Sequence, residues 1–302
     1  MASINWGRTN DFIARVQRES DQYFRDHGGK RGDYRDFFRI LGIAENSGSY
    51  VDPISPHVGK YQVGEEVLKD LDFFRRDGRL LGINDMASLG DGTNPKSRIA
   101  QEIIALKEFS GLNSPSPSKY LQVRGEIKKI DSDLDLNNYI GKQYRVKFSD
   151  GEERVVLFNE ASISAAAHNL GPGSLAKILY QVIRGDTISI DNAADANGIA
   201  FTAYMELFQG FDISPLIRAN TMGEYNRFLF ELLKDNGLSD FYINNYWERF
   251  QISSLLPIFV GLFRNAEAAE PPRVGIPIVL DLDGDGVETI GINGGAYFDH
   301  DS

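Results

Sequence analysis

The sequence predicts an α+β protein that is mainly helical, with a small β insertion and a C-terminal Asp-rich module. Apolar residues recur at helical spacing through most of the first 265 residues, and alternation typical of strands occurs only near 121–158. After the linker-like stretch AEAAEPPR at 266–273, the composition turns to Gly and Asp. We therefore expect one domain over 1–265, with its β insertion at about 119–158, and a linker plus Asp/Gly-rich segment over 266–302.

The first helices follow from their apolar stripes and caps. Residues 10–27 carry a helical stripe that Gly28-Gly29 closes, and Asp33 is placed to cap a second helix through Leu41. A third helix is predicted from about Gly64 to Phe74, and a fourth after Pro95.

Short strands are then predicted from Leu121 to Phe158. KQYRVKF and RVVLF flank Asp150-Gly151, which is a hairpin signal. Helices are expected to resume at Asn159 and to continue to about Phe263. Breaks are expected at 171–173, 195–198 and 236–237.

Composition excludes several classes of function. The chain has 302 residues and a formal net charge of -11, which disfavours general affinity for nucleic acid or anionic membranes. No apolar run is long enough to span a bilayer, so we expect a soluble protein without membrane insertion. Cysteine is absent, and the four histidines form no zinc motif such as HExxH.

The first twenty residues lack the apolar core of a secretory signal. If the target lies outside the cytoplasm, the protein is expected to be exported without a signal peptide or to be a segment of a longer chain. The ending FDHDS, inside a run of alternating acids, favours the second reading.

Glu45 is the first candidate catalytic residue. It follows Phe37 and Leu41 at i+8 and i+4, which places it on the apolar stripe of the second helix. A carboxyl on such a face loses hydration, so its pKa rises and it can serve as a general acid in glycoside cleavage. The alternative is a helix-terminal Glu that reaches into water.

Three stretches together resemble the lysozyme-like superfamily of peptidoglycan glycosidases, particularly lytic transglycosylases and phage-type lysozymes. The first, GIAENSGSYVDPISPHVGKYQVG from Gly42, has a helix-terminal Glu45, the turn Asn46-Ser47-Gly48 and the Gly-x-x-Gln of 59–62. The second is AAAHNLGPG at 165–173, in which His168 stands where Tyr is commoner, and the third is DANGIAFTAYMELFQGFD at 195–212.

The resemblance implies a two-lobed lysozyme-like fold with Glu45 at the floor of a cleft. It implies cleavage of the β-1,4 bond between N-acetylmuramic acid and N-acetylglucosamine, with Glu45 protonating the leaving oxygen. The candidate substrate-binding residues are Ser47, Tyr61, Gln62, His168, Asn169, Gly171, Gly173 and Tyr204.

The chemistry of these residues indicates how each could contribute to the site. The amide of Gln62 can pair with an acetamido sugar, and Gly171 and Gly173 allow close approach of backbone to a sugar. Tyr204 is predicted either to bond Glu45 or stack on a sugar ring, or else to pack in the core. His168 fits a histidine satisfied at a helix end better than a base.

The chemistry after protonation stays open between two reactions. A lysozyme uses a second carboxylate, for which Asp52 is the candidate, although its Asp-Pro context also fits a turn. A lytic transglycosylase needs one Glu, because the sugar's own 6-hydroxyl attacks. Hydrolysis is preferred, since the third stretch resembles phage-type lysozymes. An alternative of another class is a non-catalytic, calcium-dependent wall-binding module.

The C-terminal segment carries a candidate calcium site. VLDLDGDG followed by FDHD has the D-x-D-x-D-G opening of a calcium loop, and it resembles repeats-in-toxin and iron-regulated exoproteins. The candidate ligands are Asp281, Asp283, Asp285, Glu288, Asp299 and Asp301. Position twelve of the loop is Ile292 rather than Glu, so the motif is incomplete, and a solvated acidic turn is the alternative.

The pairing of a glycosidase with such a segment resembles an antibacterial effector delivered by type VI or type I secretion. That resemblance implies action on the wall in a target bacterium's periplasm, and it implies an immunity protein and a secretion apparatus as partners. No cofactor is expected for the chemistry itself, whereas Ca²⁺ is expected as a structural or regulatory ion.

Overall fold

The computed structural model describes residues 2–52, 57–111 and 117–246. All of them belong to the first of two compact units, Met1–Ser254, and the second, Leu255–Ser302, lies outside the described residues. The described part is mainly helical with small sheets, which confirms the coarse fold class. In it, no helix is long and apolar enough to cross a membrane.

The described residues hold twelve α-helices with both ends defined, and residues 239–246 are helical as well. The twelve are α1 (Trp6–Asp26), α2 (Tyr34–Asn46), α3 (Glu65–Asp70), α4 (Asp77–Leu81), α5 (Met86–Gly90), α6 (Pro95–Phe109), α7 (Lys119–Ile130), α8 (Glu160–Leu170), α9 (Pro172–Arg184), α10 (Phe201–Phe208), α11 (Ser214–Arg218) and α12 (Met222–Asp235). Short 3-10 turns lie at Phe73–Arg75, Leu136–Tyr139 and Ile190–Asn192.

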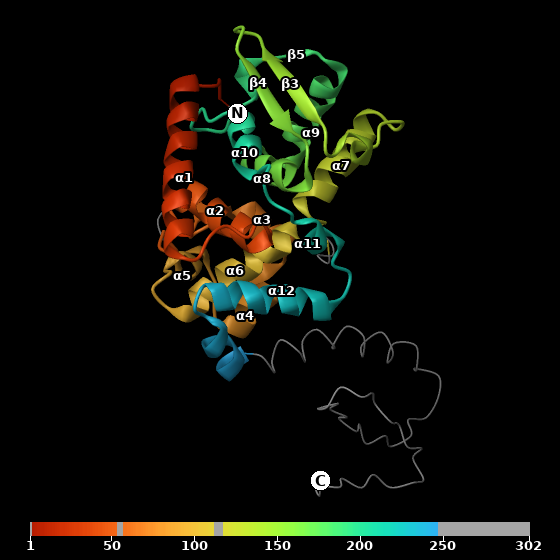
Figure 1. Cartoon of the computed structure of the whole chain (residues 1–302). Helices are drawn as coiled ribbons and strands as arrows, with labels where there is room; N and C mark the ends of the chain where they lie inside the picture. Colours follow the sequence, from red (N-terminus) through yellow and green to blue (C-terminus); the bar gives the residue numbers. More distant parts are fainter. Residues whose placement is uncertain (1, 53–56, 112–116, 247–302) are drawn as a thin grey trace, which may run out of the picture. The chain divides into compact units, whose positions relative to one another are not determined.

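Two small sheets accompany the helices. β1 (His57–Val58) pairs antiparallel with β2 (Val63–Gly64). β3 (Gln143–Phe148) pairs antiparallel with β4 (Glu153–Leu157) across the predicted Asp150-Gly151 turn, where Gly151 has φ +91°. β5 (Thr187–Ile188) adds to β3 in parallel, so the hairpin joins the segment after α9 (Figure 1).

The segment 119–130 is a helix, so the prediction that strands begin near residue 121 is wrong. Ser118 caps α7 by accepting the Leu121 N–H, and Tyr120, Val123 and Ile127 place buried side chains on one face. This face packs on α8 and α9. The helical stripe therefore outweighs the β-branched and aromatic composition that favours strands.

The third predicted helix is also shorter than expected. α3 ends at Asp70, and Asp72 adopts φ +48° before the 3-10 turn Phe73–Arg75. A left-handed non-glycine residue interrupts helical hydrogen bonding, so the stripe from Gly64 to Phe74 is divided into two pieces.

α2 is the central helix for the site. Asp33 caps it as predicted, accepting the Arg35 N–H, and Phe37, Phe38 and Leu41 are fully buried. The helix ends where Ser47 adopts φ +46°, and Arg15 of α1 donates to the carbonyls of Ile43 and Ala44 at 3.1 and 3.0 Å. These contacts fix the last turn of α2, which carries Glu45.

Small residues bring α8 and α10 together. Ala165, Ala166 and Ala167 are fully buried in α8, and this helix packs closely against α10 (Figure 1). Because alanine side chains allow backbones to approach, the end of α8 is held beside the aromatic face of α10.

Candidate active site

Glu45 lies in the last turn of α2 and is partly exposed, following three buried residues, Gly42, Ile43 and Ala44. The hydroxyl of Tyr204 in α10 donates a hydrogen bond to Glu45 Oε1 at 2.9 Å. The first and third stretches of the sequence motif, 159 residues apart at these positions, therefore meet at one carboxyl group.

The environment of Glu45 favours its protonated form. Burial raises the pKa of the Glu45 carboxyl, and the charge of His168 and the Tyr204 hydrogen bond offset only part of this effect. The negative charges of Asp195 and Glu108 raise the pKa further. A carboxyl of this kind retains its proton at higher pH than an exposed Glu, as a general acid requires.

Tyr204 is 2 % exposed, so it does not present a face on which a sugar ring could stack. Its ring packs near Phe12 and Phe208, with centroids 5.2 and 6.3 Å away. Both readings of this residue, as a partner of Glu45 and as a core aromatic, thus describe one side chain. Burial and the nearby Glu45 charge raise the pKa of the Tyr204 hydroxyl well above its usual range, so it remains a donor.

Asn169 is bound to a neighbouring loop. Its Nδ2 donates to Asp195 Oδ2 at 3.1 Å, and its buried Oδ1 has no hydrogen-bond partner among the described residues. Asp195 Oδ1 accepts the N–H groups of Asn197 and Ile199. Asn169 therefore holds the Asp195 loop through one end of its amide group, and its expected role in substrate binding stays a prediction.

His168 has acceptors at both ring nitrogens. Nδ1 lies 3.0 Å from Glu108 Oε1, and Nε2 lies 3.0 Å from the Tyr61 carbonyl oxygen. A carbonyl oxygen has no proton to donate, and a carboxylate has none either, so each ring nitrogen must donate. His168 is therefore an imidazolium inside the protein, and its buried ring does not meet the expectation of a substrate contact.

Glu108 in α6 balances two cations. Lys119 Nζ lies 2.8 Å from its Oε1, the same oxygen that His168 contacts. Burial alone would raise the pKa of Glu108, but the charges of Lys119 and His168 lower it to about 2. Burial lowers the pKa of His168, whereas Glu108 and, more weakly, Glu45 raise it, with a net increase.

The loop after Glu45 is fixed by amide side chains. Asn46 Nδ2 donates to the carbonyls of Ser49 and Gly59 at 2.9 and 3.3 Å. Gln62 Nε2 donates to Asp52 Oδ2 at 2.9 Å and to Gly59 O at 3.0 Å, and Gln62 adopts φ +48°. The structure thus pairs Asp52 with Gln62.

Tyr61 does not line a surface. It is 1 % exposed, and its hydroxyl donates to Glu102 Oε2 at 2.8 Å, so the expectation that its side chain binds substrate is wrong. Its neighbour Lys60 is equally buried and pairs with Glu102 Oε1 at 2.8 Å. Tyr61 instead contributes its carbonyl oxygen to His168.

Ser47, Gly171 and Gly173 remain accessible. Ser47 is exposed, and its Oγ lies 3.3 Å from Arg15 Nη1. Gly171 joins α8 to α9 at φ +81°, which favours glycine. A Cβ at either glycine would meet no protein atom within 4 Å, so open space lies over this turn.

Sequence reasoning missed the buried charges of α6. Glu102 and Glu108 sit among Ile103, Ile104 and Leu106, and acids inside such an apolar run are the available signal. Their cations come from other segments, so the pairing itself had no local signal.

The predicted calcium ligands lie outside the described residues. Within the described ranges, no group of three or more His, Asp or Glu side chains is arranged to hold a metal ion.

Comparisons with known proteins do not assign the chain to a family. The chain matches no family model, no curated protein and no solved structure. The candidate site therefore rests on the sequence motifs and on the contacts around Glu45.

Proposed function

We propose that this chain is a peptidoglycan-cleaving glycosidase of the lysozyme type, with Glu45 as the general acid. The observation that carries the proposal is the Glu45 carboxyl at the end of α2, which has a raised pKa and is held at 2.9 Å by the Tyr204 hydroxyl. General-acid catalysis requires a carboxyl that is both protonated and oriented.

The proposed step begins with proton transfer. Glu45 gives its proton to the glycosidic oxygen between N-acetylmuramic acid and N-acetylglucosamine, while the bond from that oxygen to the anomeric carbon breaks. The leaving sugar departs as an alcohol and Glu45 becomes a carboxylate. The Tyr204 hydrogen bond and the His168 charge both stabilise that carboxylate, because each lowers the pKa of Glu45.

The group that attacks the anomeric carbon distinguishes hydrolysis from transglycosylation. A lysozyme adds water, whereas a lytic transglycosylase closes the sugar's own 6-hydroxyl onto the anomeric carbon. One observation favours the second reaction: Asp195 and Glu108, whose charges act on Glu45, are already bound to other protein groups. Asp52 remains the proposed second carboxylate for hydrolysis, and it binds Gln62.

The decisive experiment is digestion of purified peptidoglycan, followed by mass spectrometry of the released muropeptides. Wild type should clear the suspension, with reducing ends indicating hydrolysis and anhydro ends indicating transglycosylation. Glu45→Gln keeps the side-chain shape but removes the acid, so we expect a loss of about 10²–10⁴-fold.

Glu66→Gln is the matched control, because Glu66 is an exposed acid in the first turn of α3. It should clear peptidoglycan like wild type. Full clearance by Glu45→Gln would contradict the proposal, and it would favour another catalytic residue. Binding of peptidoglycan without cleavage by wild type would favour the non-catalytic wall-binding module.

The Asp-rich segment stays a proposed calcium site in a secreted antibacterial effector. Because the Glu45 chemistry uses no metal, removing Ca²⁺ with a chelator should leave cleavage by the described unit unchanged. Isothermal titration of Ca²⁺ into the full chain, compared with an Asp281→Asn, Asp283→Asn double variant, would measure the site directly.

A further inference from the structure

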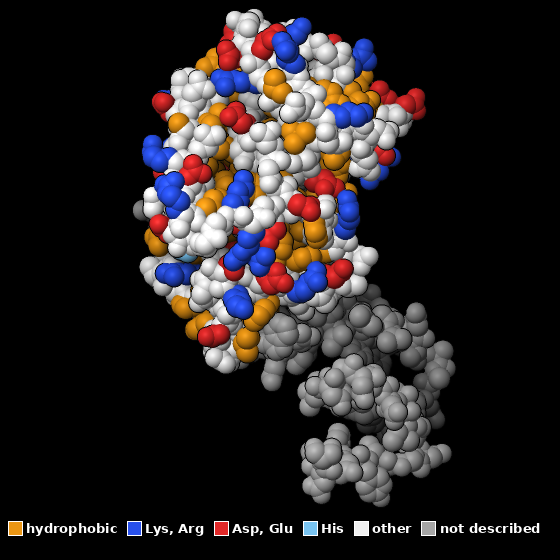
Figure 2. Space-filling view, viewed as in Figure 1, with side chains coloured by type: hydrophobic (Ala, Val, Ile, Leu, Met, Phe, Trp, Pro, Cys, Tyr) orange, Lys and Arg blue, Asp and Glu red, His pale blue; other side chains and the backbone are white. Residues whose placement is uncertain are grey.

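A second candidate site lies between the end of α1, the first half of α2 and the end of α12, in a cavity of about 180 Å³. Four lining side chains are cations, Arg31, Arg35, Arg39 and Lys60, and two are carboxylates, Asp36 and Asp235. The question for this cavity is which of the four cations lacks a carboxylate partner. On the face that Figure 2 shows, Lys and Arg side chains are interspersed with Asp and Glu side chains.

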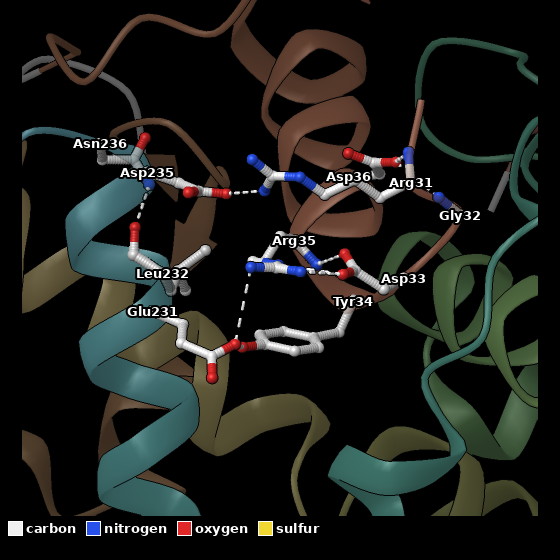
Figure 3. Close-up of polar contacts among 10 residues, drawn as sticks. All are labelled: Arg31, Gly32, Asp33, Tyr34, Arg35, Asp36, Glu231, Leu232, Asp235 and Asn236. Atoms are coloured by element: carbon white, nitrogen blue, oxygen red, sulfur yellow. Dashed lines mark hydrogen bonds and ion pairs between the residues drawn. The ribbon is translucent and has the colours of Figure 1, made fainter. Parts of the chain in front are cut away.

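Three of these cations already have carboxylate partners. Arg31 pairs with Asp235 at the end of α12, and Arg35 pairs with Asp33 and, at 3.6 Å, with Glu231 (Figure 3). The Arg35–Glu231 pair joins α2 to α12, and the Arg31–Asp235 pair joins the segment before α2 to the end of α12.

Lys60 forms the buried floor of the cavity. Its Nζ contacts Glu102 at 2.8 Å and Asn236 Oδ1 at 3.2 Å.

Arg39 is the exception. Within the described ranges, no carboxylate lies within 4.0 Å of its guanidinium, which stands 3.8 Å from the ring centroid of Tyr23. Tyr23 in turn stacks on His27 with centroids 4.0 Å apart. A guanidinium stacked on a ring keeps its N–H groups available at its edge, where they match two oxygens of one anion.

The nearest acid on α2 does not take up these donors. Asp36 Oδ2 accepts the main-chain N–H groups of Arg31 and Gly32, at 2.7 Å for Gly32 (Figure 3). Lys60 does not take part in the same way, because its ammonium group is already bound to Glu102, Tyr50 and Asn236.

We propose that this cavity binds a small oxyanion, a carboxylate or phosphate group, through the edge of the Arg39 guanidinium. Tyr23 and His27 hold the guanidinium in place, whereas the charge of Lys60 is already paired with Glu102. The site is separate from Glu45 and does not depend on the proposed glycosidase activity.

The test is isothermal titration of the full chain with sodium phosphate and, separately, sodium acetate, both at constant ionic strength. Saturable one-site binding of both probes supports a site for any oxyanion, and binding of phosphate alone assigns a phosphate-bearing ligand. Acetate alone assigns a carboxylate. Arg39→Gln should weaken binding about tenfold or more, because it removes a charge-assisted bidentate contact.

Arg184→Gln is the matched control, since Arg184 also stands over a tyrosine ring, on α9 away from the lining residues. It should bind like wild type, as should Glu45→Gln. Arg39→Lys keeps the positive charge but cannot make the bidentate contact, so its affinity should lie between those of wild type and Arg39→Gln. The proposal is overturned if wild type shows no saturable binding of either probe, or if both Arg39 variants bind like wild type.

Discussion

Glu45, partly exposed at the end of α2, and Glu108, buried in α6, are two glutamates with opposite acid–base behaviour. Burial acts on both carboxyls in the same direction, raising the pKa. Glu108 touches Lys119 and His168, and its pKa falls to about 2. Glu45 touches only a neutral hydroxyl among its described hydrogen-bond partners, and its pKa rises.

The difference shows that direct contact with a cation, rather than depth, decides which carboxyl keeps a proton. His168 contributes to both environments: it binds Glu108 directly and acts on Glu45 through its charge alone. The Glu108 carboxylate therefore holds the His168 imidazolium, whose charge stabilises Glu45 once Glu45 has given up its proton.

The largest effect should follow from removing the cation of Glu108. Lys119→Met leaves a buried carboxylate with only His168, so we expect a loss of about 3–5 kcal/mol in the free energy of unfolding, measured by urea denaturation at pH 7. Lys69→Met removes an exposed pair with Glu65 and should cost less than about 1 kcal/mol. Equal effects of the two variants would contradict the distinction.

The second largest effect should be a loss of folding stability at low pH, caused by protonation of Glu108. The folded pKa is about 2 and the ordinary value is 4.5, so the stabilisation is complete above 4.5 and is lost as the pH falls towards 2. Between pH 5.5 and 3 this group should account for about 2 kcal/mol of lost stability. Urea denaturation at both pH values should show a correspondingly smaller loss in Glu108→Gln, which has no carboxyl to titrate there.

For Glu45, folding stability should change with pH in the direction opposite to that for Glu108. Its folded pKa lies above the unfolded one, so folding stability decreases as the pH rises above about 4.5, where the unfolded chain ionises first. Glu45→Gln should therefore be more stable than wild type at pH 7, by roughly 0.5–2 kcal/mol, while losing activity. At pH 4 the two melting curves should converge, and a persistent difference there would point to packing instead.

Tyr204→Phe should give the smallest change. The missing hydroxyl costs about 0.5–1.5 kcal/mol of stability and raises the Glu45 pKa further, because that hydrogen bond favours the carboxylate. Activity that needs the protonated acid should then persist to higher pH, so the descending limb of kcat/KM should move upward. Tyr180→Phe on α9 is the control, and its profile should match wild type.

Local sequence was enough for several elements. The stripe of Phe37 and Leu41 and the cap at Asp33 predicted α2 with Glu45 at its end, and Asp150-Gly151 predicted the β3–β4 hairpin. Each depends on neighbours within a few positions, where steric and hydrogen-bonding preferences act.

The segment 119–130 was misassigned because Tyr120, Val123 and Ile127 suit either a strand or a helix. Packing against α8 and α9 selected the helix. Tyr61 was misassigned for a related reason, since its place in a motif says nothing about the buried Glu102 that takes its hydroxyl.

By itself, the sequence determined the helical periodicity, the caps, the hairpin and the position of an acid at the end of a helix. Tertiary structure alone decided the charges: it brought Lys119 to Glu108, Tyr204 to Glu45 and the Tyr61 carbonyl to His168. Electrostatic interactions depend on distance through space and on exclusion of water, and neither quantity is encoded in the local spacing of residues.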